Sequence, residues 1–300
     1  MKERIIDDDF ICRLETMALY LQNPMRGFFG GNHRTDSYGQ TVEFADFREY
    51  VLGDDIRYVD WNLYGRFEKH FVRLFADERQ MHMRIFLDCS ASMEKADREK
   101  ARFALRATAA LGFLSAQNMD KTSFLFMKGG FADNPCGLMT GKNSFYLNLA
   151  RLEELEFKGE TDIEKAVTNY SDDGTNDGLT VIISDFLTES DWKKAVDYLI
   201  FRKRQVMLIQ VLSPEELNPF NNNGRMFLRD AEAGDITDER HMKMKITKAH
   251  IEAYRDALRD FKAGIKAFCA SRGVTFLSAD CGEPVDRFLF RELLTAGTVR

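Results

Sequence analysis

Two nearly continuous apolar segments, each ending on an aspartate, place the strongest constraint on how this chain folds. They are residues 84–88, which end on Asp88, and residues 178–185, which end on Asp185. Short apolar runs without alternation are typical of strands buried on both faces, as in a parallel sheet covered by helices. The carboxyl ends of such strands line the crevice where open α/β sheets bind ligands. The sequence therefore predicts two carboxylates at the binding edge of a buried sheet.

Helical and strand-like segments alternate along the chain after residue 81. Apolar residues recur at helical spacing in residues 94–118, 143–156, 161–170, 190–203, 248–271 and 284–296, while strands are expected at residues 122–127, 205–212 and 274–277. Residues 129–141 and 225–246 contain turn signals that fit a hairpin or an edge strand. We therefore expect residues 81–300 to form one α/β domain, with a Rossmann-like, mainly parallel sheet and helices on both faces.

The first 80 residues have a different pattern. Residues 9–24 read as one amphipathic helix, and glycines then punctuate short mixed segments between residues 26 and 80. We expect residues 1–80 to contribute this helix and an irregular segment with short strands. Within it, Asp and Arg side chains of residues 53–66 are expected to pair, with Trp61 as an anchor. A purely structural alternative makes the whole of 1–80 a scaffold for assembly.

The composition indicates which kinds of partner and which cellular compartment to expect. The net charge is −6, so the chain lacks the basic surface that nucleic acid or an anionic membrane would attract. The five cysteines are odd in number and form no CxxC pair, which favours reduced thiols in the cytoplasm. The start of the sequence has no apolar signal core, and no apolar run is long enough to span a bilayer. We therefore expect a cytoplasmic protein without direct membrane insertion.

Oxygen-bearing side chains follow the two aspartate-ending strands. Asp88-Cys-Ser90-Ala-Ser92 comes directly after the first strand, Thr161 stands at a loop-to-helix junction, and Asp185 ends the other strand. Carboxylate and hydroxyl oxygens are the ligands that Mg²⁺ prefers. Taken singly, each residue also has an ordinary explanation as a helix cap or a turn residue. The prediction of a metal site therefore depends on the whole set and its order.

That order resembles the metal-ion-dependent adhesion site of von Willebrand factor A domains. The resemblance implies that Ser90 and Ser92 bind Mg²⁺ or Mn²⁺ directly, and that Thr161 binds directly or through water. Asp88 and Asp185 would act mostly through waters, and one open coordination position would take a partner's carboxylate. The chain departs from the usual Thr-Asp-Gly at Ser184-Asp185-Phe186, and we expect Phe186 to alter the rim of the site.

A second resemblance covers most of the chain. Residues 39–44, 48–50, 53–57 and 60–61, with the later Arg229-Asp230-Ala-Glu232-Ala-Gly234 and the helix of Tyr254, are similar to the bacterial "domain of unknown function 58" family. This resemblance implies a von Willebrand-type adaptor that works with a MoxR-type AAA+ ATPase or with a client of that ATPase.

Two functional hypotheses follow. The first is a metal-dependent protein-interaction module without catalytic activity. The alternative is a metal-assisted hydrolase in which the same ion activates water, although no histidine in these motifs supplies a general base. Cys89, between Asp88 and Ser90, is either a reactive thiol or a small buried side chain.

Overall fold

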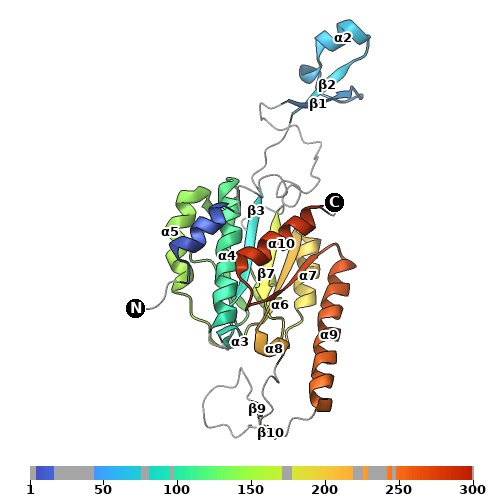
Figure 1. Cartoon of the computed structure of the whole chain (residues 1–300). Coiled ribbons are helices and arrows are strands. Elements are labelled where there is room, and N and C mark those ends of the chain that lie inside the picture. Colours follow the sequence, from blue (N-terminus) through green and yellow to red (C-terminus); the bar gives the residue numbers. More distant parts are fainter. Residues whose placement is uncertain are drawn as a thin grey trace. The chain divides into compact units, whose positions relative to one another are not determined.

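The computed structural model of the protein describes residues 5–16, 44–75, 81–94, 98–170, 178–218, 226–228, 242–244 and 248–298. The chain divides into two compact units (Figure 1). One comprises Met1–Phe29 and Met81–Arg300, and the other comprises Gly30–Gln80. Each unit is described by itself.

The larger unit is built on a seven-stranded, mainly parallel sheet. Its strand order is β11-β8-β7-β3-β4-β5, with β6 also paired to β4. The strands are β3 (His82–Asp88), β4 (Lys121–Lys128), β5 (Phe131–Asp133), β6 (Met139–Thr140), β7 (Leu179–Ser184), β8 (Gln205–Leu212) and β11 (Thr275–Asp280). All pairs among β11, β8, β7, β3 and β4 are parallel, whereas β5 and β6 run antiparallel to β4. The predicted Rossmann-like sheet is therefore confirmed.

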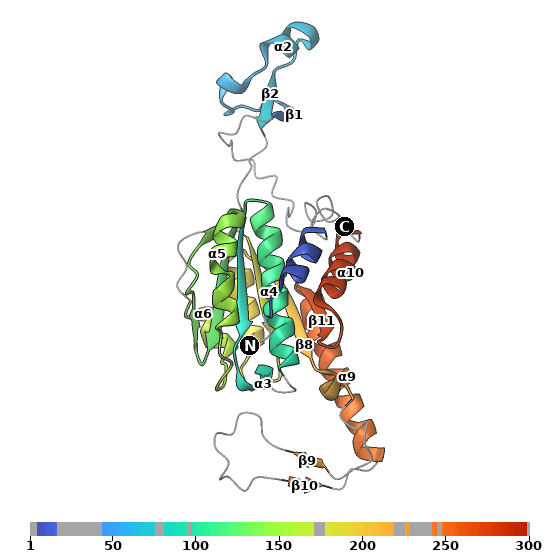
Figure 2. The same ribbon diagram turned by 60° about the vertical axis from the view of Figure 1, so that its left-hand side comes forward.

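Helices cover both faces of this sheet (Figures 1 and 2). The labelled helices of this unit are α3 (Ala91–Glu94), α4 (Glu99–Gln117), α5 (Gly141–Glu153), α6 (Ile163–Thr168), α7 (Trp192–Phe201), α8 (Pro214–Leu217), α9 (Lys248–Ala270) and α10 (Val285–Thr298). Alternate residues of β3 belong to different apolar clusters. Ile85 and Leu87 pack with residues of α4, α5 and α10, and Phe86 packs with residues of α6, α7 and α9. This burial on both faces explains why residues 85–87 of the strand are all apolar.

The N-terminal helix belongs to the larger unit, which corrects the expected division at residue 81. Residues 8–16 are helical, and Phe10 and Leu14 are fully buried in the apolar cluster that contains α4. Arg106 of α4 donates to the Ile5 carbonyl at 2.7 Å, and its guanidinium lies 5.2 Å from the centre of the Phe10 ring. The apolar stripe of this helix needs the core of the later α/β unit to bury it. The rest of the expected helix, residues 17–24, lies outside the described residues.

The smaller unit contains short elements, as predicted. They are β1 (Phe44–Glu49), η1 (Ile56–Tyr58), α2 (Trp61–Phe67) and β2 (Phe71–Phe75), and β1 pairs antiparallel with β2. The expected Asp–Arg pairing is present, because the Arg57 Nη2 lies 2.6 Å from the Asp55 Oδ2. Asp60 caps α2 by accepting from the amides of Asn62 and Leu63. Trp61 is 62% exposed, so its expected role as an anchor is wrong.

A short antiparallel pair precedes α9. β9 (Met226–Leu228) pairs with β10 (Met242–Met244), as the predicted hairpin requires. The residues between these strands, including Arg229, Glu232 and Gly234, lie outside the described residues. None of the helices in the described ranges combines the length and apolarity needed to cross a membrane.

Candidate metal-binding site

The two predicted aspartates stand at the same edge of the sheet. β3 and β7 are parallel neighbours, with Leu87 opposite Ile183, so both strands end at this edge. Asp88 is the last residue of β3, and Asp185 directly follows β7. Both are only 2% exposed. The buried strands thus hold two carboxylates at the carboxyl end of the sheet, as the sequence predicted.

The turn after β3 brings the two serine hydroxyls together. The backbone amide of Ser90 donates to the Asp88 Oδ1 at 2.9 Å. This Asx turn directs the chain into α3, and the Oγ atoms of Ser90 and Ser92 lie 3.0 Å apart. The Ala91 amide donates to the Gly159 carbonyl at 2.8 Å, which ties this turn to the loop that carries Thr161.

Thr161 is brought to the same place by its own loop. It forms a bridge with Gly129 and is only 5% exposed, and its hydroxyl donates to the Met127 carbonyl at 3.4 Å. The hydroxyl of Thr188, in the segment after β7, donates to the Thr161 carbonyl at 3.2 Å. The structure therefore gathers Asp88, Ser90, Ser92 and Thr161, with Asp185 on the neighbouring strand end.

The electrostatics around Asp88 favour a cation. Burial raises the pKa of this carboxyl, and the nearby charge of Asp185 raises it further. Hydrogen bonds from the Ser184 hydroxyl, at 2.6 Å, and from the Ser90 amide act in the opposite direction but do not cancel the rise. A buried carboxyl with a raised pKa gains from a positive charge nearby. The donor set, two carboxylates and three hydroxyls, consists of hard oxygens and fits Mg²⁺ or Mn²⁺.

Among the described residues, no group of three or more His, Cys, Asp or Glu side chains is placed to hold a metal. That Asp88, Ser90, Ser92, Thr161 and Asp185 are the ligands of a metal stays a prediction.

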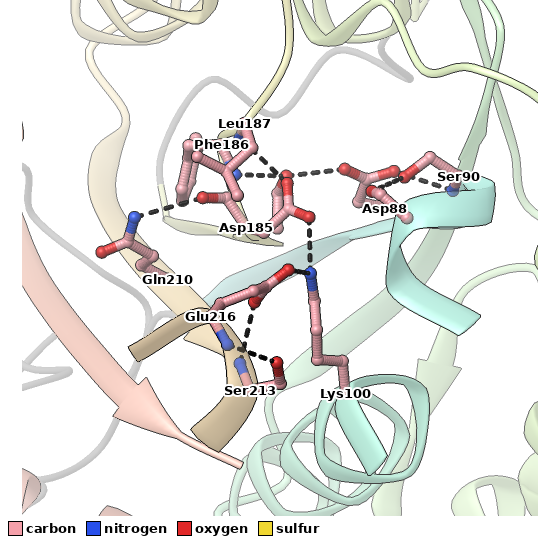
Figure 3. Close-up of polar contacts among 11 residues, drawn as sticks. Asp88, Ser90, Lys100, Asp185, Phe186, Leu187, Gln210, Ser213 and Glu216 are labelled. Atoms are coloured by element: carbon pink, nitrogen blue, oxygen red, sulfur yellow. Dashed lines mark hydrogen bonds and ion pairs between the residues drawn. The ribbon is translucent and has the colours of Figure 1, made fainter. Parts of the chain in front are cut away.

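Asp185 has partners that the sequence did not suggest. Figure 3 shows the Lys100 side chain extending from its helix toward Asp185 and Glu216. The ammonium donates to the Asp185 Oδ2 at 2.7 Å and to the Glu216 Oε1 at 2.7 Å. Burial disfavours the charged form of Lys100, but the two carboxylates outweigh burial and raise the pKa of this lysine. The Asp185 Oδ1 accepts from the Leu187 amide at 2.9 Å.

Lys100, Glu216 and Ser184 are thus contacts of the site that sequence reasoning missed. One signal was present for Lys100, because it lies on the same helical stripe as Phe103 and Ala107, both buried. A lysine on a buried stripe needs a carboxylate partner. For Glu216 the one local signal is Ser213 three residues earlier, a spacing typical of a helix cap.

Phe186 does not shape the rim of the site, which corrects that expectation. Its side chain is 1% exposed and packs against Trp192, with the ring centres 5.5 Å apart. Its backbone is left-handed, with a φ of 58°. Glycine adopts this conformation without strain, which gives a physical reason for the glycine that von Willebrand-type domains often place here. In this chain the buried contacts of Phe186 hold the turn instead.

A model of the family described as "Protein of unknown function DUF58" matches residues 46–259. This match covers more than half of the chain. The chain belongs to the DUF58 family. The larger unit of this DUF58 protein has the mainly parallel sheet with helices on both faces that the sequence predicted.

Curated relatives of this DUF58 protein include the uncharacterized proteins Rv1480 of Mycobacterium tuberculosis and Mb1516 of Mycobacterium bovis. Each is 27% identical over 239 residues, which is 78% of this chain and 74% of the relative.

Similar solved structures include the conserved hypothetical protein BatB of Bacteroides thetaiotaomicron. It is 14% identical, with a TM-score of 0.42, over 73% of this chain and 100% of that one. A von Willebrand factor type A protein of Catenulispora acidiphila is 16% identical, with a TM-score of 0.36, over 47% of this chain and 35% of that one.

Proposed function

We propose that this DUF58 protein is a metal-dependent protein-interaction module that binds rather than catalyses. A Mg²⁺ or Mn²⁺ ion held by Asp88, Ser90, Ser92, Thr161 and Asp185 would take a partner's carboxylate at its open position. The observation that carries the proposal is the convergence of oxygen side chains from three separate loops at one buried sheet edge, with Ser90 Oγ and Ser92 Oγ 3.0 Å apart.

The ligand types support binding of an anionic group. Neutral hydroxyls contribute no charge, and the Asp185 carboxylate is already shared with Lys100. An ion held in this way keeps much of its positive charge, so an incoming carboxylate gains a strong charge-assisted contact. An aspartate or glutamate on a partner protein is the simplest source of that group.

For the partner we propose a MoxR-type AAA+ ATPase, or a client of that ATPase, in the cytoplasm. This part of the proposal rests on the family's usual association. The five cysteines are free thiols, which is consistent with a reducing compartment.

The test compares the wild type with the double variant Ser90→Ala, Ser92→Ala. Millimolar Mg²⁺ or Mn²⁺ should raise the Tm of the wild type, because a ligand that binds only the folded state stabilises it. The double variant should fold but show no rise. The same metal dependence should appear when the purified ATPase is captured, with capture lost in EDTA and in the double variant.

A matched control is Ser144→Ala, Ser271→Ala. Both serines lie on helix surfaces or ends away from the site, so this variant should respond to metal as the wild type does. Equal metal-induced shifts in the wild type and in the Ser90/Ser92 variant would exclude the proposed site.

A further inference from the structure

Lys100 is a buried cation in direct contact with a proposed metal ligand. Its side chain is only 1% exposed, and its ammonium lies 2.7 Å from the Asp185 Oδ2. Lys100 is the second residue of α4, so the helix backbone fixes where the side chain starts. A buried ammonium is costly without carboxylate partners. Lys100 is therefore a fixed competitor for the charge of Asp185.

The second partner of Lys100 is Glu216, which is itself held in place. Glu216 and Ser213 form a capping box at the start of α8, where the Glu216 Oε2 accepts from the Ser213 amide at 2.8 Å. The Tyr254 hydroxyl of α9 donates to the Glu216 carbonyl at 2.7 Å. Figure 3 shows the Lys100 ammonium in contact with both Glu216 and Asp185. The ammonium is thus shared between a proposed metal ligand and a carboxylate that lies outside the ligand set.

We propose that Lys100 is a positioning residue that weakens metal binding by competing with the ion for Asp185, and that Glu216 relieves this competition. The inference rests on the metal site of the proposed function. The Lys100 ammonium and a divalent metal ion are both attracted to the Asp185 carboxylate, and they repel each other. Glu216 binds the same ammonium through its Oε1 atom and offsets part of the positive charge of Lys100.

The competition has a consequence for partner binding. An ion held weakly by its own site gains more from an additional carboxylate, because the incoming negative charge offsets the repulsion from Lys100. Metal and partner should therefore bind with positive coupling, and by linkage each should raise the affinity for the other. Lys100 would keep the site from holding its ion tightly until a partner's acidic residue arrives.

The first test uses Lys100→Met, which keeps the length of the side chain and removes its charge. Mg²⁺ and Mn²⁺ affinity is measured by calorimetry and the Tm in EDTA by calorimetric scanning. We expect metal affinity to rise about tenfold or more, since one unit charge near a divalent ion has that effect even at the dielectric constant of water. The Tm in EDTA should fall, because Asp185 and Glu216 lose their shared cation. A purely structural role predicts instead that affinity and Tm fall together, and that result would overturn the inference.

The second test does not depend on how well Lys100→Met folds. Glu216→Gln keeps an oxygen for the Ser213 amide but removes the charge that faces Lys100. Its neighbour Glu215 is exposed on the same short helix, so Glu215→Gln removes an equal charge without this contact. We expect Glu216→Gln to weaken Mg²⁺ binding severalfold and Glu215→Gln to change it by less than about twofold. Equal effects of the two changes, or tighter binding in Glu216→Gln, would refute the role of Lys100.

The outcomes separate this inference from the proposed function. If the wild type binds no metal through Ser90 and Ser92, the metal site fails and the inference fails with it. If the wild type binds metal but Lys100→Met binds equally or more weakly, the metal site stands and only the competition is wrong.

Discussion

Cys89 lies between two residues of the proposed site, yet its thiol faces the core. Its side chain is 0% exposed and belongs to the apolar cluster that contains α4. Burial raises the pKa of this thiol, and the neighbouring Asp88 charge raises it further. The thiolate is the reactive form of cysteine, so the structure favours a small buried side chain over a reactive thiol.

Alkylation should therefore discriminate among the cysteines. With iodoacetamide at about pH 8, Cys12, which is exposed, should react within minutes, whereas Cys89 should stay unmodified in the folded protein. Cys269 should also be protected, because burial raises its pKa to about 11. Peptide mass spectrometry measures each site, and unfolding in guanidinium should make all five cysteines reactive. Modification of Cys89 as fast as Cys12 would show that its thiol is accessible.

Single residues of the candidate site differ in how far the sequence could predict them. Asp88 and Asp185 were predictable, because a change from apolar to polar residues marks the end of a buried strand. The contact between Lys100 and Glu216 was not, since it joins positions 116 residues apart. No local pattern encodes such a pairing, and only the packing of α4 against the end of β8 creates it.

At the scale of elements, α4 packs against the sheet through a glycine. A Cβ atom added at Gly112 would lie 2.5 Å from the Phe124 Cζ and 3.2 Å from the Phe145 Cε2. Phe124 is in the middle of β4 and is fully buried, so it has little room to move. This close approach sets the distance between α4 and the strand that neighbours β3.

Gly112→Ala should destabilise the protein by about 1–3 kcal/mol, in spite of the better helix propensity of alanine, because overpacking forces the aromatic rings to shift. The matched control is Gly264→Ala in α9, where an added Cβ meets nothing within 4 Å. That change should stabilise by up to about 1 kcal/mol. Unfolding in guanidinium measures the change in the free energy of unfolding for both variants. Similar changes at the two glycines would mean that Gly112 is not a packing contact.

The order and type of the elements were largely predictable from hydrophobic periodicity. Helix ends were less so, because residues 94–118 read as one helix whereas α3 ends at Glu94 and α4 begins at Glu99. Arg98 directly precedes α4 and has a left-handed backbone, with a φ of 66°. Hydrophobic periodicity does not encode this local turn, so it did not predict where α4 begins.

At the scale of the whole molecule, the larger unit is formed by two separate stretches of the sequence. Residues 1–29 and 81–300 form that unit, and residues 30–80 form the other. The sequence could not reveal this, because an amphipathic helix at residue 9 shows that it has an apolar face but not which core covers that face. A chain that starts at residue 81 would leave the Phe10 and Leu14 contacts of the core uncovered, so it is a poor tool for testing the role of residues 30–80.

Point substitutions give a cleaner test of this division. The protein has two tryptophans, Trp61 in the smaller unit and the buried Trp192 in the larger one. In a Trp61→Phe background, the fluorescence of Trp192 therefore reports unfolding of the larger unit alone. Adding Phe10→Ala should lower the free energy of unfolding by about 3–5 kcal/mol, because Phe10 is 0% exposed and its loss leaves a cavity beside α4.

The matched control is Phe67→Ala in the same background. Phe67 is 62% exposed and belongs to the smaller unit, so the same chemical change should leave the Trp192 transition within about 0.5 kcal/mol of its parent. If Phe67→Ala shifted this transition as much as Phe10→Ala, the two units would unfold as one cooperative body. If Phe10→Ala had no effect, the N-terminal helix would not contribute to the core that supports β3 and the candidate site. The expected contrast instead makes residues 5–16 part of the scaffold that holds Asp88 and Lys100 in place.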